Sequence, residues 1–236
     1  MKIAASNTST LSRPAAVLWD LDGTLIDQTQ GTISCFQKVI RTLGFPEPDA
    51  HRIRRSLGGP LPESMALFIP SDRVAEAVKH FRAHFPSIMM DGLVLLDGGM
   101  ACLERLSKME IPQAILTNKH GPTARQVCES TGISQWTQLC VGNGDTAWSK
   151  PEAQLVAHTL ESLAFEVGGP VWMIGDSPTD VQTALNADLI PYAVTTGAHS
   201  AAELKEAGAA DVFESLCELQ VRLQAFKAVY TNESNN

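Results

Sequence analysis

Short apolar runs alternate with longer amphipathic stretches along most of the chain. The apolar runs predict strands over five segments: Ala16–Leu21, Gln113–Thr117, Gln138–Val141, Pro170–Ile174 and Pro191–Thr195. Helical periodicity between them predicts helices over Gly98–Lys108, Pro122–Thr131, Glu152–Leu163 and Thr179–Asn186. Strands that are apolar throughout and alternate with helices are typical of a parallel sheet covered on both faces. The predicted fold class is therefore α/β, with a Rossmann-like parallel sheet flanked by helices.

A mostly helical stretch from about Thr29 to Leu95 interrupts this alternation after the first strand. Its apolar residues recur at helical spacing, at Ile33, Phe36, Val39, Ile40 and Leu43 and again at Val74, Ala77, Val78, Phe81 and Phe85. Such an insert predicts a small α-helical cap domain. The expected organisation is a polar N-terminal tail (1–15), an α/β core (16–27 and 96–228), the cap (28–95) and a polar C-terminal tail (229–236).

Composition and charge narrow the classes of function. The 236 residues are 44% hydrophobic, which is too apolar for a disordered chain. The formal net charge is −8 without a basic tract, so neither nucleic acid nor a membrane surface is an expected partner. Five widely spaced cysteines contain no Cys-x-x-Cys pair and indicate neither a zinc site nor a redox pair. The N-terminus lacks the apolar stretch of a secretory signal, so the expected location is cytoplasmic.

Two carboxylates follow the first strand, at Asp20 and Asp22. Residues two apart on an extended chain point the same way, so both face one region. One carboxylate can attack an electrophile while the other moves protons. Gly23 permits a sharp turn, and the Thr24 hydroxyl can bond nearby backbone. The alternative is an ordinary polar turn at a strand end.

Polar groups also follow the other strands, where ligands bind in open parallel sheets. Thr117 and Asn118 end the second strand and can either donate to phosphate oxygens or form a capping turn. Lys150, before a proline, offers positive charge to a phosphate site or is a surface charge. Asp176 and Asp180 follow a fourth strand, and carboxylate oxygens beside a phosphate are what Mg²⁺ prefers. Asp180 alternatively caps the helix that begins near it.

Together these pieces resemble the four motifs of the haloacid dehalogenase-like superfamily of phosphohydrolases. They stand in the family's order, as Asp20-Leu21-Asp22-Gly23-Thr24-Leu25, Thr117-Asn118, Lys150-Pro151 and Gly175-Asp176-Ser177-Pro178-Thr179-Asp180. Within the family, the first two motifs and the turn Leu57-Gly58-Gly59-Pro60-Leu61 look most like phosphoglycolate phosphatases. The resemblance implies a Mg²⁺-dependent phosphatase of a small phosphorylated metabolite, with 2-phosphoglycolate as the leading candidate.

The resemblance also implies roles for single residues. Asp20 would be the nucleophile that forms an aspartyl-phosphate, and Asp22 the general acid and base. Mg²⁺ would bind the carboxylates of Asp20 and Asp176 and the backbone carbonyl of Asp22. Asp180 would orient Lys150 or a metal-bound water, and Thr24 would support the first motif.

The phosphate itself would be held by Thr117, Asn118 and Lys150. Arg52, Arg54 and Arg55 precede the Gly58 turn, and Arg55 is the candidate to reach a substrate carboxylate, against the alternative of a solvated surface charge. Two other functions stay open: a phosphosugar mutase of the β-phosphoglucomutase type, and a non-catalytic binding protein on the same fold. A monomer or a homodimer is expected.

Overall fold

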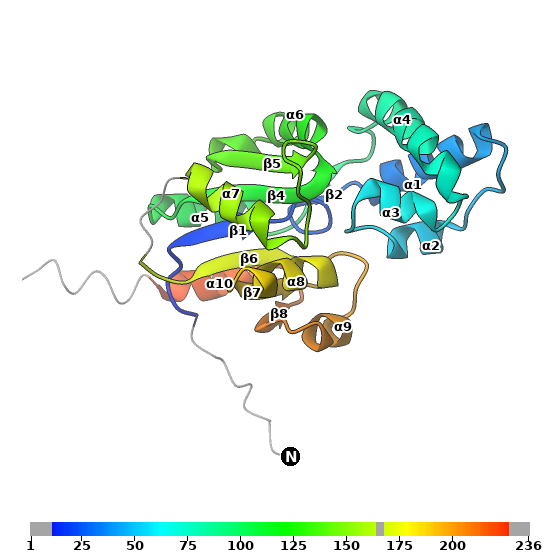
Figure 1. Cartoon of the computed structure of the whole chain (residues 1–236). Coiled ribbons are helices and arrows are strands. Elements are labelled where there is room, and N and C mark those ends of the chain that lie inside the picture. The colour runs from blue at the N-terminus through cyan, green and yellow to red at the C-terminus, as the bar shows by residue number, and fades with distance from the viewer. Residues whose placement is uncertain (1–10, 164–167, 227–236) are drawn as a thin grey trace, which may run out of the picture.

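A six-stranded parallel sheet forms the centre of the computed structural model, which describes residues 11–163 and 168–226 (Figure 1). Its strand order is β5-β4-β1-β6-β7-β8. The strands are β1 (Ala16–Trp19), β4 (Gln113–His120), β5 (Leu139–Asn143), β6 (Val171–Gly175), β7 (Ile190–Val194) and β8 (Asp211–Phe213). Because all pairings are parallel, the carboxyl ends of these strands meet at one edge of the sheet.

Helices cover both faces of the sheet, which confirms the predicted α/β class. They are α5 (Gly99–Lys108), α6 (Gly121–Thr131), α7 (Ala153–Leu163), α8 (Pro178–Asn186), α9 (Ala201–Glu206) and α10 (Leu216–Ala225). The side chains of alternate β1 residues pack into two different apolar layers, one on each face of the sheet. Val17 and Trp19 join the cluster containing α5, α6 and α10, whereas Ala16 and Leu18 join the cluster containing α7 and α8. All four side chains are fully buried, as expected for a central parallel strand.

The segment between β1 and β4 is helical, as its periodicity predicts. It contains α1 (Thr29–Thr42), α2 (Ala50–Arg55), α3 (Leu61–Ala66) and α4 (Val74–His84), which lie together beyond one edge of the sheet in Figure 1. Eight of its ten predicted apolar positions are buried, and Leu43 and Val74 are partly buried against the same cluster. Two short antiparallel strands, β2 (Ile26–Asp27) and β3 (Val94–Leu95), pair where the helical insert leaves and rejoins the core.

Three elements near the C-terminus were not predicted: β8, α9 and α10. The strand has three residues and α9 has six, so neither is long enough to show a clear hydrophobic period. The predicted tail 229–236 and most of the tail 1–15 lie outside the described residues. No helix in the described part of the chain is both long enough and apolar enough to cross a bilayer.

Candidate active site

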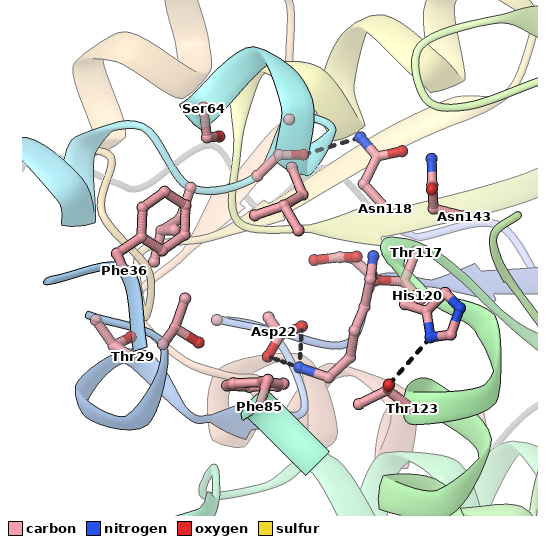
Figure 2. A pocket seen from close by; sticks show the side chains of 18 of the residues that line it. Asp22, Thr29, Phe36, Ser64, Phe85, Thr117, Asn118, His120, Thr123 and Asn143 are labelled. Carbon is pink, nitrogen blue, oxygen red and sulfur yellow. Dashed lines mark hydrogen bonds and ion pairs between the residues drawn. The ribbon is translucent and has the colours of Figure 1, made fainter. Parts of the chain in front are cut away.

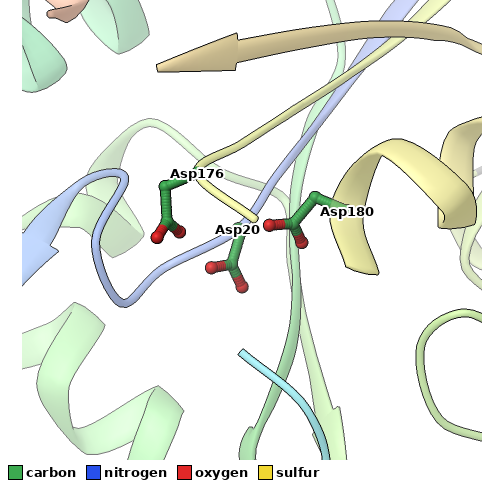
Figure 3. Close-up of side chains that lie close together, drawn as sticks. All are labelled: Asp20, Asp176 and Asp180. Atoms are coloured by element: carbon green, nitrogen blue, oxygen red, sulfur yellow. The ribbon is translucent and has the colours of Figure 1, made fainter. Parts of the chain in front are cut away.

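Three carboxylates converge at the carboxyl edge of the sheet (Figure 3). Asp20 directly follows β1, Asp176 directly follows β6, and Asp180 lies in the first turn of α8. One oxygen from each lies within 4.8 Å of the others, and all three side chains are buried. The structure therefore brings together three acidic residues that are widely separated in sequence.

Lys150 is the cation inside this cluster. Its Nζ donates to Asp20 Oδ1 and to Asp180 Oδ1, both at 2.6 Å, and its side chain is 1% exposed. Burial lowers the pKa of Lys150, but the Asp180 and Asp20 carboxylates outweigh burial, so the net shift is upward. The two carboxylates thus favour the charged form of the ammonium group beside the strand ends, and the hydrogen bond to Asp180 helps to fix its position.

Asp180 owes its position to the start of α8. Ser177 is the N-cap, and its Oγ accepts from the Asp180 backbone N–H while the Asp180 carboxylate accepts from the Ser177 backbone N–H. This capping box fixes the first turn of the helix. Asp180 therefore both caps the helix and pairs with Lys150, so the two alternatives for this residue hold together.

The turn after β1 brings backbone close to Asp176. Gly23 has φ of +84°, and a Cβ built on it would lie 2.5 Å from Asp176 Oδ2. Only glycine allows both that conformation and that approach. Thr24 Oγ1 donates to Asp176 Oδ1 at 3.3 Å, so this hydroxyl supports a carboxylate of the fourth motif, where nearby backbone was the expected partner.

Asp22 lies at the mouth of the site and pairs with Lys119. The Lys119 Nζ lies 3.0 Å from both oxygens of the Asp22 carboxylate, whose side chain is 39% exposed (Figure 2). Sequence reasoning gave Lys119 no role. Its signal was its place directly after Thr117 and Asn118 at a strand end.

Thr117 and Asn118 lie within the carboxyl half of β4 and are buried. Asn118 Oδ1 accepts from the Lys150 backbone N–H at 3.0 Å, and its Nδ2 donates to the Gly58 carbonyl of the helical insert at 3.1 Å. Asn118 thus ties the Lys150 loop and the insert to the sheet. The Thr117 hydroxyl accepts from the Lys119 backbone N–H.

Arg55 does not line the cavity beside the carboxylates. Its guanidinium donates to the Ala198 carbonyl at 2.6 Å and pairs with Glu203 at 2.5 Å. Both partners belong to the α/β part of the chain and not to the helical insert. Neighbouring Arg54 lines the cavity instead, and its Nη2 lies 3.4 Å from the Gly197 carbonyl. The prediction that Arg55 contacts substrate therefore has no support from this geometry; Arg55 joins the insert to the core.

A cavity of about 140 Å³ lies between the insert and the strand ends (Figure 2). Asp20, Asp22 and Asp176 lie on its core side, and Phe36 and Phe85 on its insert side. One side of the cavity is therefore acidic, and the other combines aromatic rings with the side chains of Arg54 and Arg82, which suits a small ligand with a charged end and an organic end.

The carboxylates need a cation to ionise together. Burial raises the pKa of Asp20 to about 6, with Lys150 acting in the opposite direction. Burial, then Asp180 and Asp20, raise the pKa of Asp176 well above its ordinary value. With Asp22 and Asp180, four carboxylates face the two ammonium groups of Lys119 and Lys150, which leaves a formal charge of −2. Hard oxygen ligands and this charge fit a divalent cation such as Mg²⁺.

A buried acidic cluster at the strand ends of a parallel α/β fold, beneath a helical insert, can serve a metal-assisted hydrolytic enzyme. Residues 17–194 match the family described as haloacid dehalogenase-like hydrolase, and the chain belongs to this family. The predicted resemblance is thereby confirmed.

Several relatives carry phosphatase names. The chain is 30% identical over 198 residues to the probable phosphatase IndB of Dickeya dadantii, covering 81% of this chain and 85% of that protein. It is 28% identical to a phosphoglycolate phosphatase of Rhodospirillum rubrum, covering 87% and 89%. The crystal structure of a predicted phosphatase from Clostridium acetobutylicum superposes with a TM-score of 0.82 at 27% identity, covering 91% and 100%. These likenesses confirm the prediction of a phosphoric monoester hydrolase.

Proposed function

We propose that the protein is a Mg²⁺-dependent phosphatase that acts through an aspartyl-phosphate on Asp20. The observation that carries this proposal is the buried cluster of Asp20, Asp176 and Asp180 around Lys150, with Asp22 at its mouth. A carboxylate can attack a phosphate dianion only where cations offset their repulsion. Lys150, 2.6 Å from Asp20, supplies one such charge at the attacking group.

In the first step an Asp20 oxygen forms a bond to phosphorus while the bond from phosphorus to the ester oxygen breaks. The ester oxygen leaves with the electron pair and takes a proton from Asp22, which lies on the same cavity. Thr117 and Asn118 line the cavity beside these groups. The Thr117 hydroxyl can donate to a phosphate oxygen, whereas the Asn118 amide already donates to the Gly58 and Lys150 carbonyls.

In the second step a water oxygen bonds to phosphorus and Asp22 takes a proton from that water. The bond between phosphorus and the Asp20 oxygen breaks, its electron pair returns to the carboxylate, and inorganic phosphate leaves. Asp22 ends each turnover with the proton that it needs for the next one.

The carboxylates of Asp20 and Asp176 and the backbone carbonyl of Asp22 are the groups proposed to hold Mg²⁺. When bound, the ion supplies Lewis-acid charge that offsets the negative charge of nucleophile and phosphate. Asp180 is not among the proposed ligands, because Lys150 and Ser177 already hydrogen-bond its two carboxylate oxygens.

The leading candidate substrate is 2-phosphoglycolate. A relative at 28% identity is named phosphoglycolate phosphatase, and the cavity has room for a small metabolite. Arg54 and Arg82 of the insert line the same cavity and can pair with a carboxylate at the organic end of the substrate. The cytoplasmic location and the oligomeric state stay predictions.

The test is phosphate release from a panel of phosphomonoesters that includes 2-phosphoglycolate and hexose phosphates, with and without Mg²⁺. Wild type should release phosphate only with the metal, and Asp20→Asn should release none. Asp91→Asn, an exposed Asp-to-Asn change in the insert, serves as the control and should match wild type. Isomerisation of a sugar phosphate without release would indicate the mutase instead. Absence of both reactions from the whole panel would refute the enzyme assignment to these esters.

A further inference from the structure

The Lys119 ammonium is buried and fully engaged at the mouth of the site. Its side chain is 8% exposed although lysine is normally solvated. The Nζ donates to both oxygens of Asp22 and to Oε1 of Gln28, and it lies 5.1 Å from the ring centroid of Phe85. Three acceptors and an aromatic face use all the directions in which an ammonium group can interact.

Asp22, by contrast, depends on this one partner. Among the described residues, Lys119 is the only group that hydrogen-bonds the Asp22 carboxylate. Asp180, in the same site, accepts from Lys150 and also from the backbone N–H and the hydroxyl of Ser177. Without Lys119, the half-exposed Asp22 side chain would be free to rotate into solvent.

The helical insert in turn holds Lys119. Gln28, at the start of the insert, accepts from Lys119 through Oε1 and donates through Nε2 to the carbonyl of Met89, near its end. Phe85 covers the ammonium from the same side, and Figure 2 shows its ring beside Asp22. Contacts from both ends of the insert thus converge on one lysine.

We propose that Lys119 is a positioning residue that holds the Asp22 carboxylate for proton transfer, and that Gln28 and Phe85 hold the Lys119 ammonium group in place. This inference rests on the proposed function. An ammonium group only donates, so both Asp22 oxygens act as acceptors in this arrangement. An acceptor carboxylate is what the second step requires, where Asp22 takes a proton from the water that attacks phosphorus. Loss of Lys119 should therefore slow hydrolysis of the aspartyl-phosphate more than its formation.

The experiment uses p-nitrophenyl phosphate, because its leaving group needs no proton and the first step proceeds without Asp22 as an acid. Lys119→Met keeps the length and the contact with the Phe85 ring but removes the charge. We expect a burst of nitrophenolate approaching one equivalent of enzyme, followed by a kcat lower by about 10- to 100-fold. KM should fall with kcat, so that kcat/KM changes little, because a slower second step leaves the first step unaltered.

A double-mutant cycle shows whether Lys119 acts through Asp22. Asp22→Asn should give the same burst, and adding Lys119→Met to Asp22→Asn should lower kcat by no more than about twofold. Lys119→Arg, which retains the cation, should recover part of the lost kcat. Lys108→Met, an exposed lysine paired with Glu104, is the matched control and should behave as wild type.

The opposite results are equally distinct. A fall in kcat/KM without a burst would show that Lys119 binds substrate and would overturn the inference, as would multiplicative effects in the cycle or a Lys119→Met variant as active as wild type. If wild type with Mg²⁺ releases neither nitrophenolate nor phosphate from any ester of the panel, the proposed function fails and the inference falls with it. If wild type is active and Asp20→Asn is inactive, only the inference is at stake.

Discussion

Replacing Asp176 with asparagine should make the metal-free protein more stable while removing its response to Mg²⁺. Asp176 is buried, and one of its oxygens lies within 4.8 Å of an oxygen from Asp20 and one from Asp180. Asparagine has the same shape and retains an oxygen that can accept from Thr24. The variant thus removes one charge from the cluster and leaves its packing intact.

The structure sets the size of the effect. Two unit charges 4.8 Å apart repel by about 3.5 kcal/mol at an effective dielectric constant of about 20, and Asp176 faces two such neighbours. Lys150 offsets part of this repulsion. The remaining repulsion cannot exceed the cost of protonating Asp176, because neutralising a carboxylate at pH 7 costs about 4 kcal/mol. A gain of about 2–3 kcal/mol remains, which corresponds to about 4–12 °C in Tm for a chain of this size.

The pH dependence follows from the raised pKa of Asp176. Such a carboxyl group has a higher pKa in the folded protein than in the unfolded protein. The stability of the folded protein therefore falls as the pH rises from about 4 through the pKa of the folded state. Asparagine does not titrate, so the advantage of the variant should be greatest at neutral pH and vanish near pH 4.

The assay is thermal and urea unfolding in EDTA and in Mg²⁺, at neutral and acid pH, with Asp91→Asn as the control. Wild type should gain about 2.7 kcal/mol when Mg²⁺ is at a hundredfold excess over its Kd, whereas Asp176→Asn should gain almost nothing. A metal-free variant less stable than wild type would refute the repulsion argument. An undiminished Mg²⁺ response would show that Asp176 is not a ligand.

Three other changes have defined outcomes. Lys150→Met leaves the buried carboxylates of Asp20 and Asp180 without their cation, so urea unfolding should show a loss of about 3–5 kcal/mol and phosphate release should be abolished. Ser177→Ala removes the α8 N-cap and should cost about 1–2 kcal/mol in the same assay. Arg55→Ala should leave stability near wild type, because its ion pair is exposed, and an unchanged KM for the best substrate would show that it does not bind substrate.

The central sheet was predictable because burial on both faces makes its strands continuously apolar. The four residues of β1 are an example, and their run of hydrophobic side chains has few other interpretations. The edge of the sheet was not predictable in the same way. β8 has three residues, and only its position beside β7 makes it a strand. Short elements are determined by tertiary contacts that no local pattern records.

The residues of the site likewise differ in how far the sequence predicts them. Asp20 and Asp176 could be found because each directly follows a strand, where a parallel sheet gathers ligands, and Lys150 because it stands directly before a proline near a predicted helix start. Their partners could not, because pairing depends on distances in space. Arg55 illustrates the difference. Its place before a turn predicted a contact with substrate, whereas its guanidinium pairs with Glu203, which lies 148 positions away in the sequence.

Lys119 shows how pairing changes the chemistry inferred from a motif. With Asp22 protonated for the first step, the other three carboxylates, Lys150 and a divalent cation would sum to a formal charge of zero. The second ammonium, 97 positions from Asp22, would give the metal-loaded site a formal charge of +1. This charge would attract a phosphate dianion at the mouth before the dianion reaches Asp20. Because Gln28 and Phe85 contact the Lys119 ammonium, the helical insert would contribute to the electrostatics of the proposed reaction as well as to the shape of the cavity.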